Sequence, residues 1–116
     1  MAPFEIRNKL ISDLKATRMA FFRAETAIEL DSMTPKQREA AGKVLVDVNI
    51  AITKLENIEL KAIADDLKAT SKQLIKSSDN LRDAIEDMQR FRVIIDRANV
   101  VLKLLERAAD IAGISL

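Results

Sequence analysis

Hydrophobic residues return at every seventh position through the second half of the chain. One seam comprises Leu60, Leu67, Leu74, Leu81, Met88, Ile95, Leu102 and Ala109. A second seam follows three residues later in each repeat, from Ile63 through Phe91 to Ala112, and carries small polar residues at Thr70 and Ser77. Two such positions in every seven are the pattern of helices that pack along their length. The repeat therefore predicts helix–helix contact over nearly half of the chain.

The first half of the chain carries the spacing of amphipathic helices. Apolar and small residues three and four apart predict a helix over about residues 4–31: Ile6, Leu10, Leu14, Thr17, Phe21, Ala24 and Ile28. A second helix is expected to begin at Pro35, because Thr34 and Gln37 are spaced as in a capping box. Its apolar face loses register with the seam that starts at Leu60, so we expect a kink or turn near residues 56–59.

Residues 44–52 fit two structures. Their β-branched residues alternate with other residues as in a strand: Val44, Val46, Val48, Ile50 and Ile52. A helical face through Ala41, Val48 and Leu55 fits the same segment. We favour the helix, because no other segment offers a strand partner and a lone strand would leave its backbone groups unpaired. The helix places Val46 and Ile50 on its polar side.

The polar run Ser77-Ser78-Asp79-Asn80 leaves two structures open for residues 60–112. An uninterrupted helix would be a rod of about 80 Å, which only another chain would bury. A break would give a hairpin of two helices. We favour the break, because all four residues suit caps and turns and the serines weaken the seam at its middle.

These elements predict an all-α fold, an antiparallel bundle of three to four long helices with coiled-coil-like packing. The expected helices span about 4–31, 35–57, 59–77 and 79–112, with the middle two open to fusion into one bent helix. We expect one domain over residues 1–116. The composition agrees with long helices, since the chain is 48% hydrophobic and 32% charged with two Gly and two Pro.

The residue types that are missing narrow the chemistry. The chain has no His, Cys, Trp or Tyr, so it lacks a thiolate nucleophile and the commonest general base and metal ligand. A net charge of +1 and four Phe as the only aromatic residues offer neither the basic surface nor the stacking platform of a nucleic-acid binder. We therefore expect a non-enzymatic protein with no cofactor, no metal and no nucleic-acid partner.

Four carboxylates gather where the last helix is expected to begin: Asp79, Asp83, Glu86 and Asp87. They suit a weak divalent-cation site or an acidic docking patch. We favour a structural role, because acidic side chains in the first turns of a helix complement its dipole.

The last predicted helix is apolar over most of its circumference. A helix of this kind must be surrounded, either by its own bundle or by another chain. A second apolar stripe runs nearly opposite its main apolar arc. Together with two residues of the predicted helix 35–57, this stripe forms our candidate protein interface: Val46, Ile50, Val93, Val100, Leu104 and Ile111. A contiguous exposed patch would be a binding surface. The alternative is that these residues fill the middle of a tight bundle.

We expect a small helical protein that binds a protein partner of open identity and forms homo-oligomers through the last helix. Small adaptors, immunity proteins, antitoxins and secretion or phage accessory proteins are of this kind. The alternative is a membrane-active bundle that lays residues 91–105 into a lipid interface, although Trp and Tyr anchors are missing. Because the chain has neither an apolar signal core nor a window of about 18 apolar residues, we expect a soluble, cytoplasmic protein.

Overall fold

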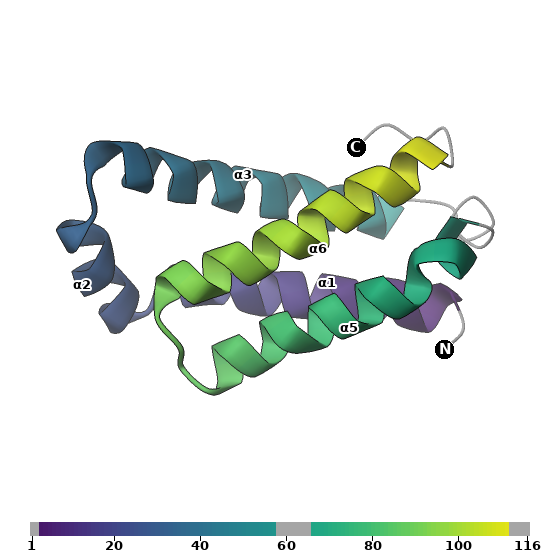
Figure 1. Cartoon of the computed structure of the whole chain (residues 1–116), viewed down its shortest axis with the longest axis horizontal. Helices are drawn as coiled ribbons and strands as arrows, with labels where there is room; N and C mark the ends of the chain where they lie inside the picture. The colour runs from purple at the N-terminus through teal and green to yellow at the C-terminus, as the bar shows by residue number, and fades with distance from the viewer. Residues whose placement is uncertain (1–2, 58–65, 112–116) are drawn as a thin grey trace.

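A computed structural model describes residues 3–57 and 66–111, with side chains described over 4–57 and 71–107. The helices are α1 (Pro3–Ala20), α2 (Ala24–Ser32), α3 (Pro35–Asn57), α5 (Asp66–Glu86) and α6 (Phe91–Ile111) (Figure 1). The described residues contain no strand, which confirms the all-α class. In particular, residues 44–52 form part of α3, so the helical interpretation of the alternating segment is confirmed and the strand is wrong.

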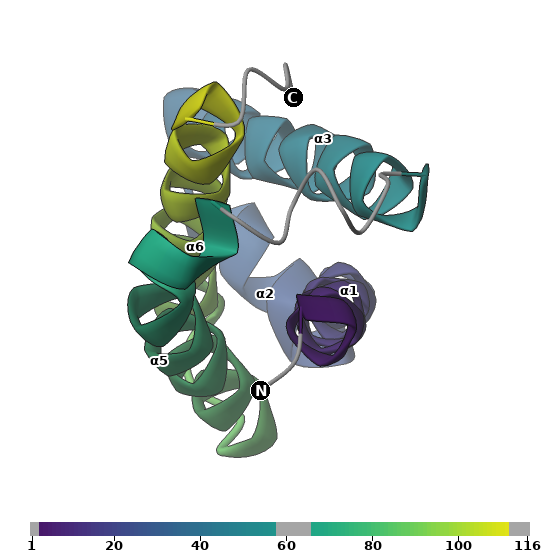
Figure 2. The same cartoon turned by 90° about the vertical axis from the view of Figure 1, so that its right-hand side faces the viewer.

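The four long helices pack around a shared core, and each of α3, α5 and α6 runs opposite to the long helix before it in the chain (Figure 1). Contacts of Arg18 with Asn49 and of Lys15 with Glu56 show that α1 and α3 are antiparallel. By contrast, α1 and α5 run in the same direction, as Figure 1 shows. Of the neighbouring helices, α1–α3 and α5–α6, which lie side by side in Figure 2, are antiparallel, whereas α1–α5 and α3–α6 are parallel.

The helix predicted over residues 4–31 is interrupted at residues 21–23. Three backbone bonds from residues 21, 22 and 23 back to residues 18, 19 and 20 tighten the end of α1. The hydroxyl of Thr26 then donates to the carbonyl of Ala20, which satisfies an acceptor at the end of α1. The interruption lets the ring of Phe21 meet Phe91 edge to face, with centroids 4.5 Å apart. A tertiary contact thus ends this helix, where the sequence has no Gly, Pro or cap signal.

The break predicted at residues 77–80 is also wrong, because α5 continues through all four residues. Ser78 is fully buried and its hydroxyl has a partner on α1, so this polar run needs no turn. The chain instead reverses at residues 87–90, where Met88 adopts φ 52°. The expected hairpin of two helices is therefore confirmed, its predicted boundary between residues 77 and 79 is wrong, and so is the alternative of one rod.

The turn at Met88 has the hydrogen bonds of a Schellman motif. The N–H of Gln89 donates to the carbonyl of Ala84 at 3.0 Å, and the N–H of Met88 donates to the carbonyl of Ile85 at 3.2 Å. Glycine is the usual residue at such a left-handed position. Because a methionine stands here instead, the heptad pattern ran through the turn without a sequence signal.

The boundary predicted at Pro35 is confirmed. The N–H of Gln37 donates to the hydroxyl of Thr34, and the side chain of Gln37 accepts from the N–H of Thr34. This is the reciprocal capping box that the spacing predicts. At its other end α3 stops at Asn57, within the region where a turn is expected, and residues 58–65 lie outside the described part of the chain.

The core is apolar along the centre of the bundle. Leu10, Leu14, Val48, Leu74, Leu81, Ile94 and Val101 are its most deeply buried large residues. Seam residues of both halves of the repeat contribute, since Leu74 and Leu81 of α5 and Ala98 of α6 are buried. Met88 of the same seam is 60% exposed at the turn. Within this chain the repeat therefore describes two helices packed against each other.

Candidate functional site

The α6 residues of the candidate interface differ in how exposed they are. Val100 is 47% exposed, whereas Val93 and Leu104 are half-buried and pack against the core. The side chain of Ile111 lies outside the described side chains. Half of the predicted stripe on this helix, Val93 and Leu104, thus takes part in packing of the bundle, and Val100 is a surface residue.

The α3 part of the candidate interface faces outward. Val46 is 55% exposed and Ile50 is 44% exposed, while Val44, Val48 and Ala51 on the opposite side of α3 are buried. Gly42, also exposed, lies one helical turn before Val46 on the same face. We call the set Gly42, Val46 and Ile50 the outer ridge of α3.

The two exposed parts of the candidate interface do not merge into one surface. Ile50 and Leu102 line a shallow groove between α3 and α6. Val100 precedes Leu102 by two residues on α6. The two side chains therefore point about 200° apart around the helix axis, and Val100 faces away from the groove. The outer ridge of α3 and Val100 of α6 are therefore separate surfaces.

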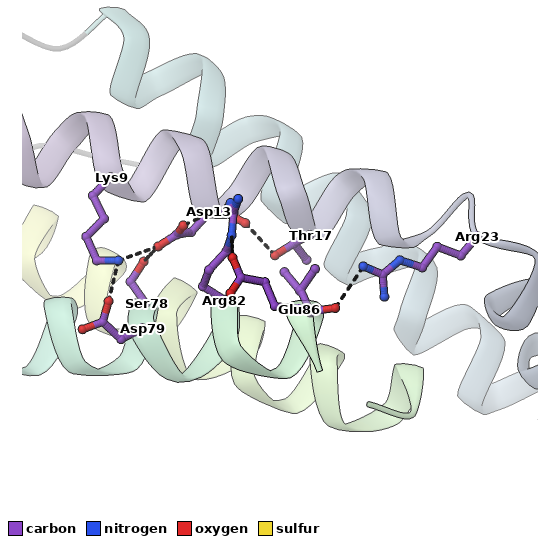
Figure 3. Close-up of polar contacts among 9 residues, drawn as sticks. Lys9, Asp13, Thr17, Arg23, Ser78, Asp79, Arg82 and Glu86 are labelled. Atoms are coloured by element: carbon purple, nitrogen blue, oxygen red, sulfur yellow. Dashed lines mark hydrogen bonds and ion pairs between the residues drawn. The ribbon is translucent and has the colours of Figure 1, made fainter. Parts of the chain in front are cut away.

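A buried polar network joins α1 to α5 (Figure 3). Its centre is Asp13, which is 5% exposed on the core side of α1. One carboxylate oxygen, Oδ2, accepts from Lys9 Nζ at 2.9 Å and from the hydroxyl of Ser78. The other oxygen, Oδ1, accepts from Arg82 at 3.4 Å. A buried charge is tolerated when it is paired and hydrogen-bonded in this way.

Two further carboxylates extend the network toward solvent. Asp79 Oδ1 lies 2.6 Å from Lys9 Nζ, and Glu86 accepts from Arg82 at 3.0 Å. Burial lowers the pKa of Lys9, but hydrogen bonds to Asp79 and Asp13 and their negative charges outweigh it and raise the pKa above its ordinary value. Lys9 therefore stays protonated and bridges both carboxylates at neutral pH.

The network favours a structural role over catalysis. Ser78 is fully buried, so no substrate reaches its hydroxyl in this conformation. The nearest carboxylate, Asp13, already accepts from three donors. Sequence reasoning missed this pair, although one signal was present: Asp13 interrupts the apolar face between Leu10 and Leu14, and Ser78 lies in the polar run of the seam.

Charged side chains around α2 hold the turn between α5 and α6. Arg23 donates to the carbonyl of Ile85 at 3.0 Å, near the carboxyl end of α5. The carboxylate of Glu29 accepts the N–H groups of Phe91 at 3.1 Å and Arg92 at 2.8 Å, at the start of α6. A cation near a helix C-terminus and an anion at an N-terminus both complement the helix dipoles. Because Glu29 lies 62 residues from Phe91, no local pattern reveals this cap.

The acidic cluster lies in a different place from the one predicted. Because α5 runs unbroken to Glu86, Asp79, Asp83 and Glu86 fall in its last turns, where a carboxylate opposes the helix dipole. Pairing with Lys9 and Arg82 offsets this for Asp79 and Glu86. Over the described residues, no group of three or more Asp or Glu side chains is arranged to hold a metal ion.

Neither the described helices nor the comparisons identify the protein. Within the described residues, no helix combines the length and the apolar character needed to cross a membrane. Comparison of the chain with protein-family models, curated proteins and solved structures gives no match. The functional argument therefore rests on the surfaces and contacts of this chain.

Proposed function

We propose that this protein is a non-enzymatic interaction module that binds proteins through helix–helix contacts and self-associates. The observation that carries the proposal is the outward position of Val46, Ile50 and Val100, which are 44–55% exposed on two long helices. Their neighbours on the inner faces complete the core without them. Burial of such side chains by a partner is favourable by about 25 cal/mol for each Å² of apolar surface.

The polar groups of the chain support the same proposal. The most buried of them, Asp13, Thr17, Thr26 and Ser78, all have hydrogen-bond partners within the chain. These groups hold helices together and leave little chemistry for a substrate. We therefore favour a binding function over an enzymatic one.

The packing of α6 favours a protein partner over a lipid surface. Phe91, Ile94, Ala98, Val101 and Leu105 on its apolar face are all at most 4% exposed. Insertion of this helix into a membrane would require the bundle to open and lose that core. The exposed residues of α3 and α6, in contrast, are available without any rearrangement.

The test uses the folded protein with single charges placed on its two exposed surfaces. Val46→Glu and Val100→Glu are compared with wild type by multi-angle light scattering and by capture of binding proteins from cells of the source organism. The proposal expects at least one variant to keep its thermal unfolding temperature and lose self-association or a specific captured protein. Wild type that neither associates nor captures a protein sensitive to either variant would refute it.

A further inference from the structure

We infer that α2 is part of a strap that opens and closes over the apolar start of α6 while the four long helices stay packed. The strap comprises Arg23 and α2, and it lies at the end of the bundle where α5 joins α6 (Figure 1). The surface beneath it is formed by Phe91 and Ile94. The inference goes beyond the proposed function, because this surface is covered in the closed state, unlike the exposed residues of α3 and α6.

The strap has little apolar packing against the bundle. All nine residues of α2 are described, and among them Thr26 is the buried one. Ile28 is instead 73% exposed, and Leu30 is half-buried. Within the described part of the chain, the extensive contacts between helices all join α1, α3, α5 and α6. Segments with few buried apolar contacts are those that open locally while the rest of a protein stays folded.

Hydrogen bonds of charged side chains attach the strap to the hairpin of α5 and α6. Arg23 donates to the carbonyl of Ile85 at 3.0 Å. Glu29 accepts from the N–H groups of Phe91 at 3.1 Å and Arg92 at 2.8 Å. These backbone groups lie at helix ends on the edge of the bundle, so water replaces the strap as their partner when it opens. Opening therefore leaves no buried polar group unpaired, and its net cost is small.

A hollow of about 170 Å³ lies between the strap and the surface beneath it. Thr26 and Glu29 of the strap are among its lining residues, together with Phe91 and Ile94 of α6. Where a contact is incompletely filled, part of the dispersion attraction is lost. Phe91 and Ile94 are nevertheless only 3% and 1% exposed. Release of the strap would therefore convert a covered wall into an accessible apolar surface.

The two ends of α2 are suited to act as hinges. Arg23 has φ −72° and ψ 149°, and Met33 has φ −81° and ψ 153°, so each connection contains an extended residue. Rotation at such terminal positions moves α2 while α1 and α3 keep their structure. The side chain of Arg23 does not cap α2, and a helix of nine residues has little stability of its own. The state of α2 therefore depends on its attachment to the hairpin.

Thiol labelling detects the open state, since the chain has no cysteine of its own. Ile94→Cys places a thiol beneath the strap, and Val101→Cys, seven residues further on the same face of α6, is the matched control. Both native side chains are at most 1% exposed. We expect dithionitrobenzoate to label Ile94→Cys at a rate that changes little with low concentrations of urea. Labelling of Val101→Cys should rise steeply with urea, because it requires global unfolding.

Substitution of Glu29 tests the attachment. In the absence of urea, Glu29→Ala should raise the labelling rate of Ile94→Cys about ten-fold or more, because two hydrogen bonds to a charged group are lost. Glu25→Ala removes an exposed carboxylate of the same helix and should leave the rate within about two-fold.

Amide hydrogen exchange gives a second measurement on the unsubstituted protein, which decides the inference if Ile94→Cys fails to fold. The amides of Phe91 and Arg92 donate to Glu29 and should exchange with little dependence on urea, unlike the amide of Val101. Equal urea dependence beneath the strap and at residue 101, or an unchanged rate with Glu29→Ala, would overturn the inference. Since no binding partner enters these experiments, that result would leave the proposed function in place.

Discussion

Asp13 and Ser78, which are 65 residues apart in the sequence, form a buried hydrogen bond where α1 packs against α5 (Figure 3). Ser78 donates its hydroxyl to Oδ2 of Asp13, and both residues are at most 5% exposed. The bond fixes the axial position of one helix relative to the other, because a shift of either helix would separate the buried Ser78 hydroxyl from its acceptor and Asp13 from Arg82. It also explains how α5 continues through a run of residues that favours turns.

Removal of either partner is expected to destabilise the fold. Ser78→Ala should lower the free energy of unfolding by about 1 kcal/mol, the usual value of one hydrogen bond. Asp13→Ala should lower it by about 2 kcal/mol or more, because it leaves the Ser78 hydroxyl buried without its acceptor and removes the shared partner of Lys9 and Arg82. Chemical denaturation measures both values.

The matched control is the exposed ion pair of Lys43 and Asp47, 3.2 Å apart on the surface of α3. Lys43→Ala should change the free energy of unfolding by less than about 0.5 kcal/mol. A double-mutant cycle with Asp13→Ala and Ser78→Ala should show a coupling energy well above zero. Additive effects of the two substitutions would contradict the shared bond.

Stability should fall at alkaline pH through Lys9. The pKa of Lys9 is raised in the folded protein above the value of 10.5 expected for an unfolded chain. A raised pKa means that the protonated form stabilises the fold, fully below about pH 10.5 and less as the pH rises through the folded pKa. The difference in thermal unfolding temperature between wild type and Lys9→Met should therefore shrink from about pH 9 to about pH 12.

An exposed lysine on α5 supplies the comparison for this pH dependence. Lys72→Met removes a charge from an exposed side chain of the same bundle and controls for the loss of a surface lysine charge itself. The absence of Tyr and Cys is helpful here, since neither phenol nor thiol ionisation overlaps with that of lysine. A constant difference between wild type and Lys9→Met would refute the role assigned to Lys9.

Much of the fold could be predicted from local sequence patterns. The reciprocal contact of Thr34 and Gln37 needs only neighbouring residues, so the start of α3 was predictable. The breaks at residues 21–23 and 87–90 were not, because contacts between distant segments support them. Phe21 meets Phe91 at the first break, and Met88 adopts a left-handed conformation that glycine would have signalled at the second.

The candidate surface was predicted less completely than the fold. The helical wheel of α3 correctly set Val46 and Ile50 apart from the core face, because one-sided burial follows directly from helix geometry. The helical wheel of α6 did not reveal that Val100 is exposed while Val93 and Leu104 are half-buried, because two neighbouring helices cover the flanks of α6. Which side of a helix a second neighbour covers is a property of the tertiary arrangement.

Replacement of Met88 by glycine is expected to stabilise the protein. Met88 adopts φ 52° at the end of α5, a conformation that costs a non-glycine residue about 1 kcal/mol. Its side chain is 60% exposed, so Met88→Gly loses little packing. Chemical denaturation should show a gain of about 0.5–1 kcal/mol. Met19→Gly is the control, because Met19 is 66% exposed within α1 and the same substitution there should lose about 1 kcal/mol.

Two glutamate substitutions on α6 distinguish an exposed position from a position that packs on the core. Leu104→Glu should lower the free energy of unfolding by about 2 kcal/mol or more, because it places a charge where a half-buried side chain packs on the core. Val100→Glu, four residues earlier, should change it by less than about 0.5 kcal/mol, because Val100 is 47% exposed. Chemical denaturation at low protein concentration excludes any contribution from association. Equal losses from both variants would place Val100 in the packed interior and remove it from the candidate interface.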